Sequence, residues 1–375
     1  MRTLIAAIGI LLATATGAAA ADPICIALIE EPAAPGASAA DHGDAGFRLG
    51  LDYATSGTNK VRGRPVALSV VEEPGTAYRD GADIAVAFGP SETVLAMLPA
   101  ASAAQRLLLV AEARASVVAG SNHYVVSTAA SADQLARAEA LALARPELNL
   151  FVAAEDTRDG ADTVAALKQA LGRHADTGFF VGARLVPPST ADVGSLLSTD
   201  FEGLHDLHGG RTLLAIWQDA ASPIPSIAAA GPDRFGIRLA YLGPLAPNAP
   251  LPAVGFDGIT SYFHSFPHNR VNDWLVAAWR RRFHAYPDGS AAEGMTAALA
   301  LVAALKAAPS TETEALIGAL EGLRFATPKG AMVIRKEDHQ ALQVLYQFRN
   351  EPAPRGAPML EHQFSIAELS AAEPK

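Results

Sequence analysis

Short apolar runs alternate with helix-like patterns along almost the whole chain. Apolar runs bounded by turn residues are typical of buried strands, and apolar positions one helical turn apart are typical of amphipathic helices. The alternation predicts βαβ units with mainly parallel sheets. In the first part of the chain it predicts strands at 24–29, 66–71, 83–88, 107–110 and 124–127, and helices at 43–55, 92–103 and 132–144 that complete a first lobe.

A second alternation begins at residue 148 and implies a second sheet. The span 220–265 is rich in proline and glycine, so we expect short strands mixed with loops there. The tail from Ala367 is polar and is expected to fray. The remaining predictions are strands at 148–153, 183–186, 212–217, 331–335 and 342–348, and helices at 160–171, 271–286, 290–307 and 311–322.

The first 21 residues have the pattern of a secretory signal peptide. Arg2 supplies a positive charge, residues 4–12 form an apolar stretch, and small residues at 18–21 offer a cleavage site. The apolar stretch is shorter than a membrane-spanning helix requires. We expect cleavage just before Ala21 or Asp22, with export of a soluble mature protein.

Composition narrows the possibilities further. The single cysteine, Cys25, cannot form an internal disulfide, and Pro23 and Ile24 precede it where a lipoprotein signal carries a small residue, so we expect a packed thiol without a lipid. The formal net charge is −10 and the basic residues form no long block, which argues against a nucleic-acid partner.

Several segments together resemble a known family. A predicted helix ends in Phe283, Tyr286 and Pro287, an alanine-rich helix follows at 291–307, and Gly330 is followed by Asp338-His339-Gln340. Near the start, residues 46–53 precede Gly63-Arg64-Pro65-Val66. In order and spacing these segments resemble the type 1 periplasmic solute-binding proteins of the branched-chain amino-acid and amide ABC importer class, which are similar to the Leu/Ile/Val-binding protein.

The resemblance implies an α/β fold of two doubly wound, Rossmann-like lobes joined by a three-segment hinge. Residues 22–128 would form the first part of lobe 1, 129–255 mainly lobe 2, and 256–375 the returning segments with a C-terminal hairpin and tail. The implied function is that of a periplasmic, non-enzymatic, monomeric component of an ABC importer. It would capture a small polar or carboxylated ligand between the lobes and deliver it to a permease, without a cofactor.

In lobe 1, two turns are candidates for ligand contact. Gly89-Pro90-Ser91-Glu92-Thr93 occupies the family's serine-rich turn, where Ser91 is either a helix cap or a ligand contact. The next turn, at 111–116, departs from the family's small uncharged pattern because it carries Arg114. Arg114 suits a carboxylate, with a solvated surface arginine as the alternative, and Ser116 is a further candidate.

Lobe 2 supplies two more candidates. The family's aromatic residue before a glycine is replaced by Asp159, which either faces the cleft, as Arg158 could, or caps a helix. Trp217, followed by Gln218, is either a stacking residue for a planar ligand or a core indole. Because two turns depart from the family pattern, we expect a ligand other than leucine, isoleucine or valine, such as a carboxylated planar metabolite or a quinone-type cofactor.

Other functions remain as alternatives. The same fold could serve as a periplasmic ligand sensor, and Ser91 could be the nucleophile of a serine hydrolase if a base lay within hydrogen-bond reach. The histidine pairs His264/His268 and His205/His208 lack accompanying carboxylate or cysteine ligands, so no metal site is expected. The basic run Arg280-Arg281-Arg282 is typical of a solvated helix face, with docking of a partner protein as the alternative.

Overall fold

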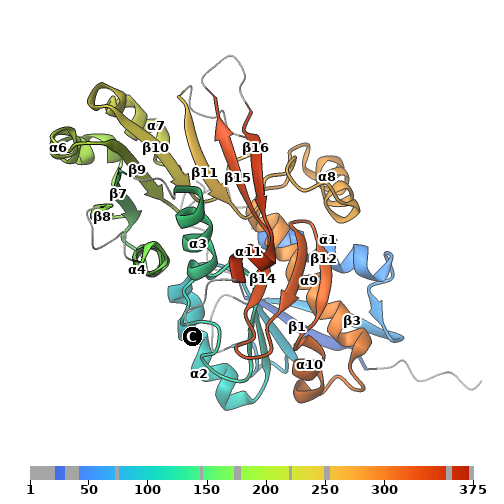
Figure 1. Cartoon of the computed structure of the whole chain (residues 1–375). Helices are drawn as coiled ribbons and strands as arrows, with labels where there is room; N and C mark the ends of the chain where they lie inside the picture. The colour runs from blue at the N-terminus through green and yellow to red at the C-terminus, as the bar shows by residue number, and fades with distance from the viewer. Residues whose placement is uncertain are drawn as a thin grey trace, which may run out of the picture.

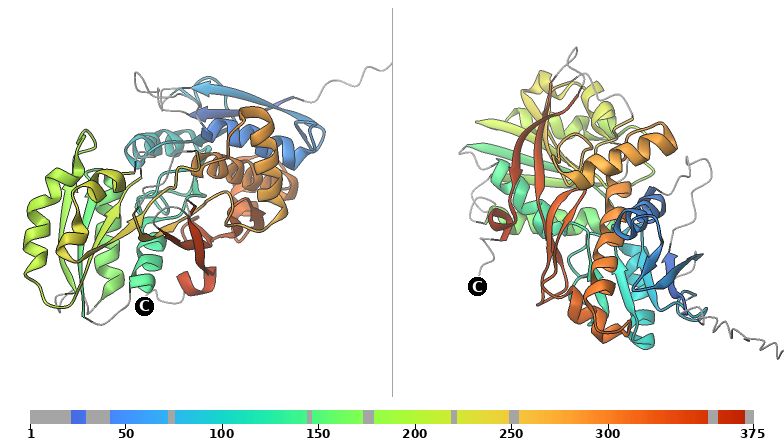
Figure 2. Two further views of the ribbon diagram at one scale, coloured as in Figure 1. Left: turned by 90° about the horizontal axis from the view of Figure 1, so that it is seen from above. Right: turned by 90° about the vertical axis from the view of Figure 1, so that its right-hand side faces the viewer.

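Two parallel-dominated sheets, one in each lobe, organise the chain (Figures 1 and 2). The computed structural model describes residues 22–29, 42–71, 76–143, 147–172, 179–218, 222–248, 254–351 and 357–370. The expected signal peptide, residues 1–21, and its cleavage site lie outside these residues. The α/β fold with two lobes that the sequence predicts is confirmed.

Lobe 1 is built on a six-stranded sheet in the order β2-β3-β1-β4-β5-β6. All its pairings are parallel except the hairpin of β2 and β3. Cys25 lies half-buried in β1. The strands are β1 Ile24–Ile29, β2 Lys60–Val61, β3 Arg64–Val71, β4 Ile84–Ala87, β5 Leu107–Val110 and β6 Val125–Ser127.

Helices cover both faces of this sheet, because the strands are apolar on both sides. One face packs against α1 (His42–Thr55), α9 (Gly289–Ala307) and α10 (Thr313–Leu320), and the other against α2 (Ser91–Ala104). Helix α8 (Arg270–Phe283) packs on α1 and α9 from outside. Helices α8, α9 and α10, from the last third of the chain, thus return to lobe 1.

Lobe 2 is built on a seven-stranded sheet in the order β16-β15-β11-β10-β9-β7-β8. Its first five strands in the chain pair in parallel, and β15 and β16 add an antiparallel edge. These strands are β7 Leu148–Glu155, β8 Phe180–Val186, β9 Gly210–Ile216, β10 Ile237–Leu242, β11 Phe256–Thr260, β15 Leu345–Asn350 and β16 Met359–Phe364.

Helices also cover both faces of the lobe 2 sheet. Helices α3 (Ala132–Leu143) and α4 (Arg158–Leu171) cover one face, and α6 (Val193–His205) and α7 (Ile224–Ala229) cover the other. A separate small sheet contains β12 (Arg324–Thr327), β13 (Gly330–Ile334) and β14 (Ala341–Gln343).

Several sequence expectations need correction. Helix α3 belongs to lobe 2, because Leu135, Ala136 and Ala138 pack on that sheet. The span 220–265 does contain short strands among loops, as expected, but two of them, β10 and β11, are interior strands of the lobe 2 sheet. Helix α6 was not predicted, and α11 (Ile366–Ser370) replaces the frayed start of the tail because Leu369 is buried against lobe 2.

The lobes are joined where three chain segments cross between them, after β6, after β11 and between β14 and β15. Side chains tie two of these crossings together. Gln340 Nε2 donates to the carbonyl of Ala129 at 2.7 Å, and Gln134 Nε2 donates to the carbonyl of Ala341 at 3.1 Å. The hinge is therefore a hydrogen-bonded crossing rather than a set of independent linkers.

Helices α1 and α9 approach closely enough to require glycine at their crossing. A Cβ on Gly294 would lie 1.9 Å from the carbonyl oxygen of Gly43, and one on Gly46 would lie 2.1 Å from that of Ala291. Helix α9 is long and apolar enough to cross a membrane by composition alone, yet it is mostly buried in lobe 1. Its apolar character is explained by this packing.

We predict that Gly294→Ala destabilises the protein by about 3 kcal/mol, because the added methyl group collides with backbone that cannot rotate away. Gly289→Ala on the same helix is the control, since a Cβ there meets no atom within 4 Å. Urea unfolding followed by circular dichroism measures both variants. Equal stability of the two would contradict the close packing of α1 on α9.

Candidate functional site

The two lobes meet where the N-terminus of α2 in lobe 1 faces the N-terminus of α4 in lobe 2. The first N–H groups of a helix have no partner inside the helix. Here each helix supplies the carboxylate that satisfies the other. The Ser91 backbone N–H donates to Asp159 Oδ2 at 3.1 Å, and the Arg158 backbone N–H donates to Glu92 Oε1. We call these four residues the reciprocal cap.

The Asp159 carboxylate lies in a set of donors from lobe 1 that we call the cradle. The cradle comprises the Ser91 N–H, the Ser91 hydroxyl and the Arg114 N–H. Asp159 Oδ1 accepts from Ser91 Oγ at 2.5 Å and from Arg114 N at 3.1 Å. Ser91 is fully buried and Asp159 is 4% exposed. Two donors at the N-terminus of α2 and a third from the loop after β5 favour a negative group, so the cradle is suited to a carboxylate.

Neither Ser91 nor Asp159 caps its own helix, although the sequence left that interpretation open. The residue at the cap of α2 is Pro90, which makes no side-chain hydrogen bond, and α4 is capped by Thr157, whose Oγ1 accepts from Gly160 N at 3.1 Å. The structure instead brings Ser91 and Asp159 together across the two lobes.

The Ser91 hydroxyl is fully engaged. It donates to Asp159 and accepts from the backbone N–H groups of Arg114 at 3.1 Å and Ala115 at 2.9 Å. The Asp159 carboxylate is the base that a hydrolase would need, but both lone pairs of the hydroxyl already face donors. The geometry therefore presents Ser91 as a binding group and not as a nucleophile.

The Arg114 side chain makes a further contact between the lobes. Its Nη1 donates to Gln218 Oε1, and the Gln218 N–H donates to Glu155 Oε2 at 2.9 Å. Arg114 is half-buried, so its guanidinium lies at the edge of the contact between the lobes. Ser116 is half-buried at the start of the turn that follows, and its contact with a ligand stays a prediction.

Trp217 lies apart from this group. Its side chain is 5% exposed within an apolar cluster of lobe 2 that includes Phe263 and Phe266. This burial favours the core interpretation over stacking on a ligand. The structure thus brings together Ser91, Arg114 and Asp159, but leaves Trp217 in the core.

Three acidic residues contribute to the site without having been predicted. Glu92 completes the reciprocal cap. Glu112 Oε2 accepts from the Gly89 N–H at 2.9 Å and so holds the turn before α2, and Glu155 holds Gln218 in the corresponding place of lobe 2. The only sequence signal is an acidic residue in the first turn of α2, which is common at helix starts and so is not specific.

A buried ion pair lies at the hinge near the cradle. Lys329 and Glu293 are 0% and 3% exposed, and Lys329 Nζ also donates to the carbonyl of Thr128 at 3.4 Å. Burial lowers the pKa of Lys329, whereas the ion pair with Glu293 opposes that shift. Removing one partner would leave an uncompensated charge, so the pair holds Lys329 where its Nζ reaches the Thr128 carbonyl on the first crossing segment.

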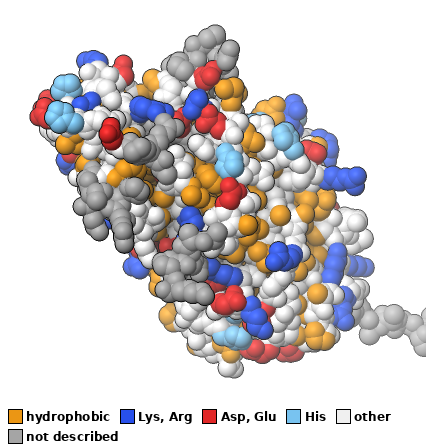
Figure 3. Space-filling view, in the orientation of Figure 1, with side chains coloured by type: hydrophobic (Ala, Val, Ile, Leu, Met, Phe, Trp, Pro, Cys, Tyr) orange, Lys and Arg blue, Asp and Glu red, His pale blue; other side chains and the backbone are white. Residues whose placement is uncertain are grey.

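The other polar features do not form a site of this kind. Among the described residues no group of three or more histidine, cysteine, aspartate or glutamate side chains could hold a metal ion. His264 stacks on Tyr286 with ring centroids 4.0 Å apart. The arginines at 280–282 are exposed in the last turn of α8, where Lys and Arg side chains gather in the space-filling view (Figure 3).

Comparisons with known proteins show the family to which the fold belongs. The family model of periplasmic binding proteins matches residues 23–353. The chain is similar to an ABC-type branched-chain amino acid transporter protein of Rhodopseudomonas palustris, with 33% identity over 92% of this chain and 97% of that chain and a TM-score of 0.78. A comparison with curated proteins found no match.

Two further solved structures share the fold. Both are solute-binding proteins of ABC transporters from Rhodopseudomonas palustris. One, in complex with 3,4-dihydroxybenzoic acid, is 20% identical over 92% of this chain and 98% of that chain, with a TM-score of 0.76. The other, in complex with p-hydroxybenzoic acid, is 18% identical over 92% and 97%, with a TM-score of 0.76.

We predict that Asp159→Ala opens the ligand-free protein. The substitution removes three hydrogen bonds to a charged group, which are together worth at least about 1.5 to 3 kcal/mol, or about ten- to a hundredfold in the ratio of closed to open molecules. Small-angle X-ray scattering should then give a larger radius of gyration than for the parent.

The control is Asp162→Ala, because Asp162 pairs with Arg158 within α4 at 3.1 Å and leaves the cradle intact. A radius of gyration unchanged by Asp159→Ala would show that the reciprocal cap does not hold the lobes together.

Proposed function

This chain belongs to the periplasmic binding protein family, and we propose that it captures a small, planar, carboxylated ligand in the cradle that Asp159 fills in the described structure. It is a solute-binding protein that works in the periplasm with the permease of an ABC importer. Cleavage before Ala21 or Asp22 and a monomeric state stay predictions.

The observation that carries the proposal is that the cradle already holds a carboxylate. Three donors of lobe 1 converge on the Asp159 side chain, and all three belong to Ser91 and Arg114. A ligand carboxylate presents the same two oxygens, so it can replace Asp159 without rebuilding lobe 1. The cradle thus supplies a reason for an anionic ligand that rests on backbone geometry and does not depend on the Arg114 side chain.

The planar shape of the ligand is supported by two structures of low sequence identity. Two relatives of the same fold are solved with hydroxybenzoic acids, which are planar carboxylates. This chain has Asp159 at the place where the family pattern that it resembles has an aromatic residue. The Asp159 carboxylate would repel the carboxylate of any ligand, including an amino acid. Asp159 must therefore leave the cradle before the ligand binds.

We infer the following order of events. The lobes open and Asp159 leaves the cradle, because the carboxylate is attached to lobe 2 whereas the donors belong to lobe 1. The ligand carboxylate then accepts from Ser91 and Arg114, and closure brings Gln218 and the Arg114 guanidinium over the ligand. Binding is therefore a competition between two carboxylates for the same donors.

The competition makes an unusual prediction for two variants. With p-hydroxybenzoate as the probe and Asp159→Ala as the background, where no side chain competes for the donors, Ser91→Ala should weaken binding about tenfold or more, because it removes a donor to the ligand. Asp159→Ala should instead strengthen binding, because the competing carboxylate is gone. Isothermal titration calorimetry measures both, with L-leucine as the comparison ligand. Weaker binding by Asp159→Ala would mean that Asp159 contacts the ligand directly, contrary to the proposal.

The Arg114 side chain is tested separately from its backbone. Arg114→Ala should weaken binding of p-hydroxybenzoate by roughly 1.5 to 3 kcal/mol, or about ten- to a hundredfold, if its charge-assisted bonds are buried in the closed site. Arg114→Lys should recover only part of the loss, since an ammonium group lacks the planar fork. If both variants bind with the affinity of the parent in the same titration, Arg114 is a solvated surface residue and does not contact the ligand.

A further inference from the structure

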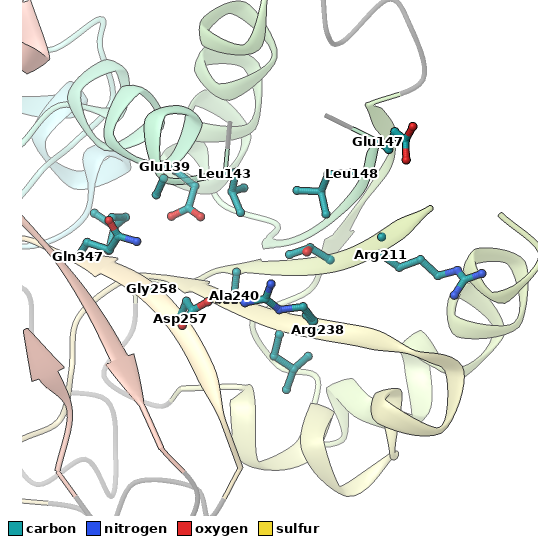
Figure 4. A pocket seen from close by; sticks show the side chains of 15 residues that line it. Glu139, Leu143, Glu147, Leu148, Arg211, Arg238, Ala240, Asp257, Gly258 and Gln347 are labelled. Carbon is teal, nitrogen blue, oxygen red and sulfur yellow. Dashed lines mark hydrogen bonds and ion pairs between the residues drawn. The ribbon is translucent and has the colours of Figure 1, made fainter. Parts of the chain in front are cut away.

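A second cavity lies in lobe 2, away from the cradle, between α3 and the sheet. Its volume is about 250 Å³, and Figure 4 shows Glu139 of α3 pointing into it. Strands β9, β10, β11 and β15 form the floor, near the ends at which β9 and β10 begin. The walls combine charged side chains with apolar ones, and the apolar side chains on the α3 side include Leu143, Leu148, Ala240 and Ile259.

Glu139 is buried without a hydrogen-bond partner for one carboxyl oxygen. Its side chain lies one helical turn from Leu135 and Ala136, on the face of α3 that packs on the sheet, and the residue is 2% exposed. Its Oε2 has no partner among the described residues. A buried carboxyl oxygen without a hydrogen bond destabilises the protein. A ligand that donates a hydrogen bond to it removes this penalty, which makes the binding free energy more favourable.

Most of the other charged groups around the cavity have partners, although Arg211 Nε has none among the described residues. Asp257 accepts from Arg238 Nη2 and from Arg349 Nε, both at 2.8 Å. Arg211 donates to the carbonyl of His205 at 2.9 Å, and in Figure 4 its side chain points away from Glu139. Glu147 and Gln347 also line the cavity, and Glu147 is exposed at its edge.

We propose that this cavity is a second binding site, which takes a small organic cation with its ammonium group against Glu139 and its alkyl chain against the apolar walls. A cation is favoured over an anion because Glu139 is an acid with an unpartnered oxygen and the charge that acts on it, that of Asp257, is also negative. The two arginines that face Asp257 are already bound to it, so they do not neutralise Glu139. The site is independent of the cradle and of the ligand proposed for it.

The protonation state of Glu139 should make the affinity for a cation depend on pH. Burial, and secondarily the charge of Asp257, raise the pKa of Glu139 to about 8. Below pH 8 the free protein therefore holds a proton on Glu139, which a bound cation must expel. Affinity for the cation should rise up to about tenfold per pH unit as the pH approaches 8, and then level off.

The test uses n-butylammonium chloride as the probe and n-butanol as the uncharged control. Calorimetry between pH 6 and 9, in buffers of different ionisation enthalpy, measures the affinity and the number of protons released. We expect tighter binding as pH rises, with release of nearly one proton per n-butylammonium at pH 6.5. Methyl resonances of Leu148 and Ile259 should shift in the NMR spectrum.

Glu139→Gln keeps the size of the side chain but removes its charge. It should lose at least tenfold in affinity for n-butylammonium and release no proton, while its affinity for p-hydroxybenzoate stays that of the parent. The proposal is overturned if n-butylammonium does not bind the parent protein, if its affinity falls as pH rises, or if the methyl resonances of Leu148 and Ile259 do not move. All three measurements use the parent chain, so they hold even if the variant folds poorly.

Discussion

The unpaired N–H groups of two facing helices are the constraint on which the described arrangement of the lobes depends. The first N–H groups of a helix need acceptors, above all the buried one of Ser91, and neither α2 nor α4 provides an acceptor from its own cap for Ser91 or Arg158. Asp159 and Glu92 provide them across the cleft instead. The donors of the cradle bind the Asp159 side chain of the opposite lobe and also suit a ligand carboxylate. Closure of the lobes and ligand recognition therefore use the same set of hydrogen bonds.

The lobes can support this exchange because each is rigid by itself. Lobe 1 is held by the close crossing of α1 and α9, where glycine at 46 and 294 allows backbone contact. The hinge is held by the buried pair of Lys329 and Glu293 together with the amide bonds of Gln340 and Gln134. We infer that motion is confined to the crossing segments, so that the cradle keeps its shape when a ligand replaces Asp159.

Much of the fold could be predicted from the sequence, because strongly apolar runs such as that of β1 record burial directly. Helix α6 was missed since its glycine and serine residues weaken the periodic pattern. Ser91, Arg114 and Asp159 were identified as candidates one at a time. Their contact was not predictable, since Ser91 and Asp159 are 68 positions apart and meet only through the arrangement of the lobes. Trp217 shows the converse, because an indole after a strand serves a core or a cleft equally well.

The central claim is that a ligand carboxylate replaces Asp159 in the cradle. A crystal structure of the protein with the small molecule that co-purifies with it tests this most directly. The account predicts a ligand carboxylate within about 3 Å of the Ser91 and Arg114 backbone nitrogens, with the Asp159 side chain withdrawn. A complex in which Asp159 still accepts from Ser91 and the ligand lies elsewhere would contradict it.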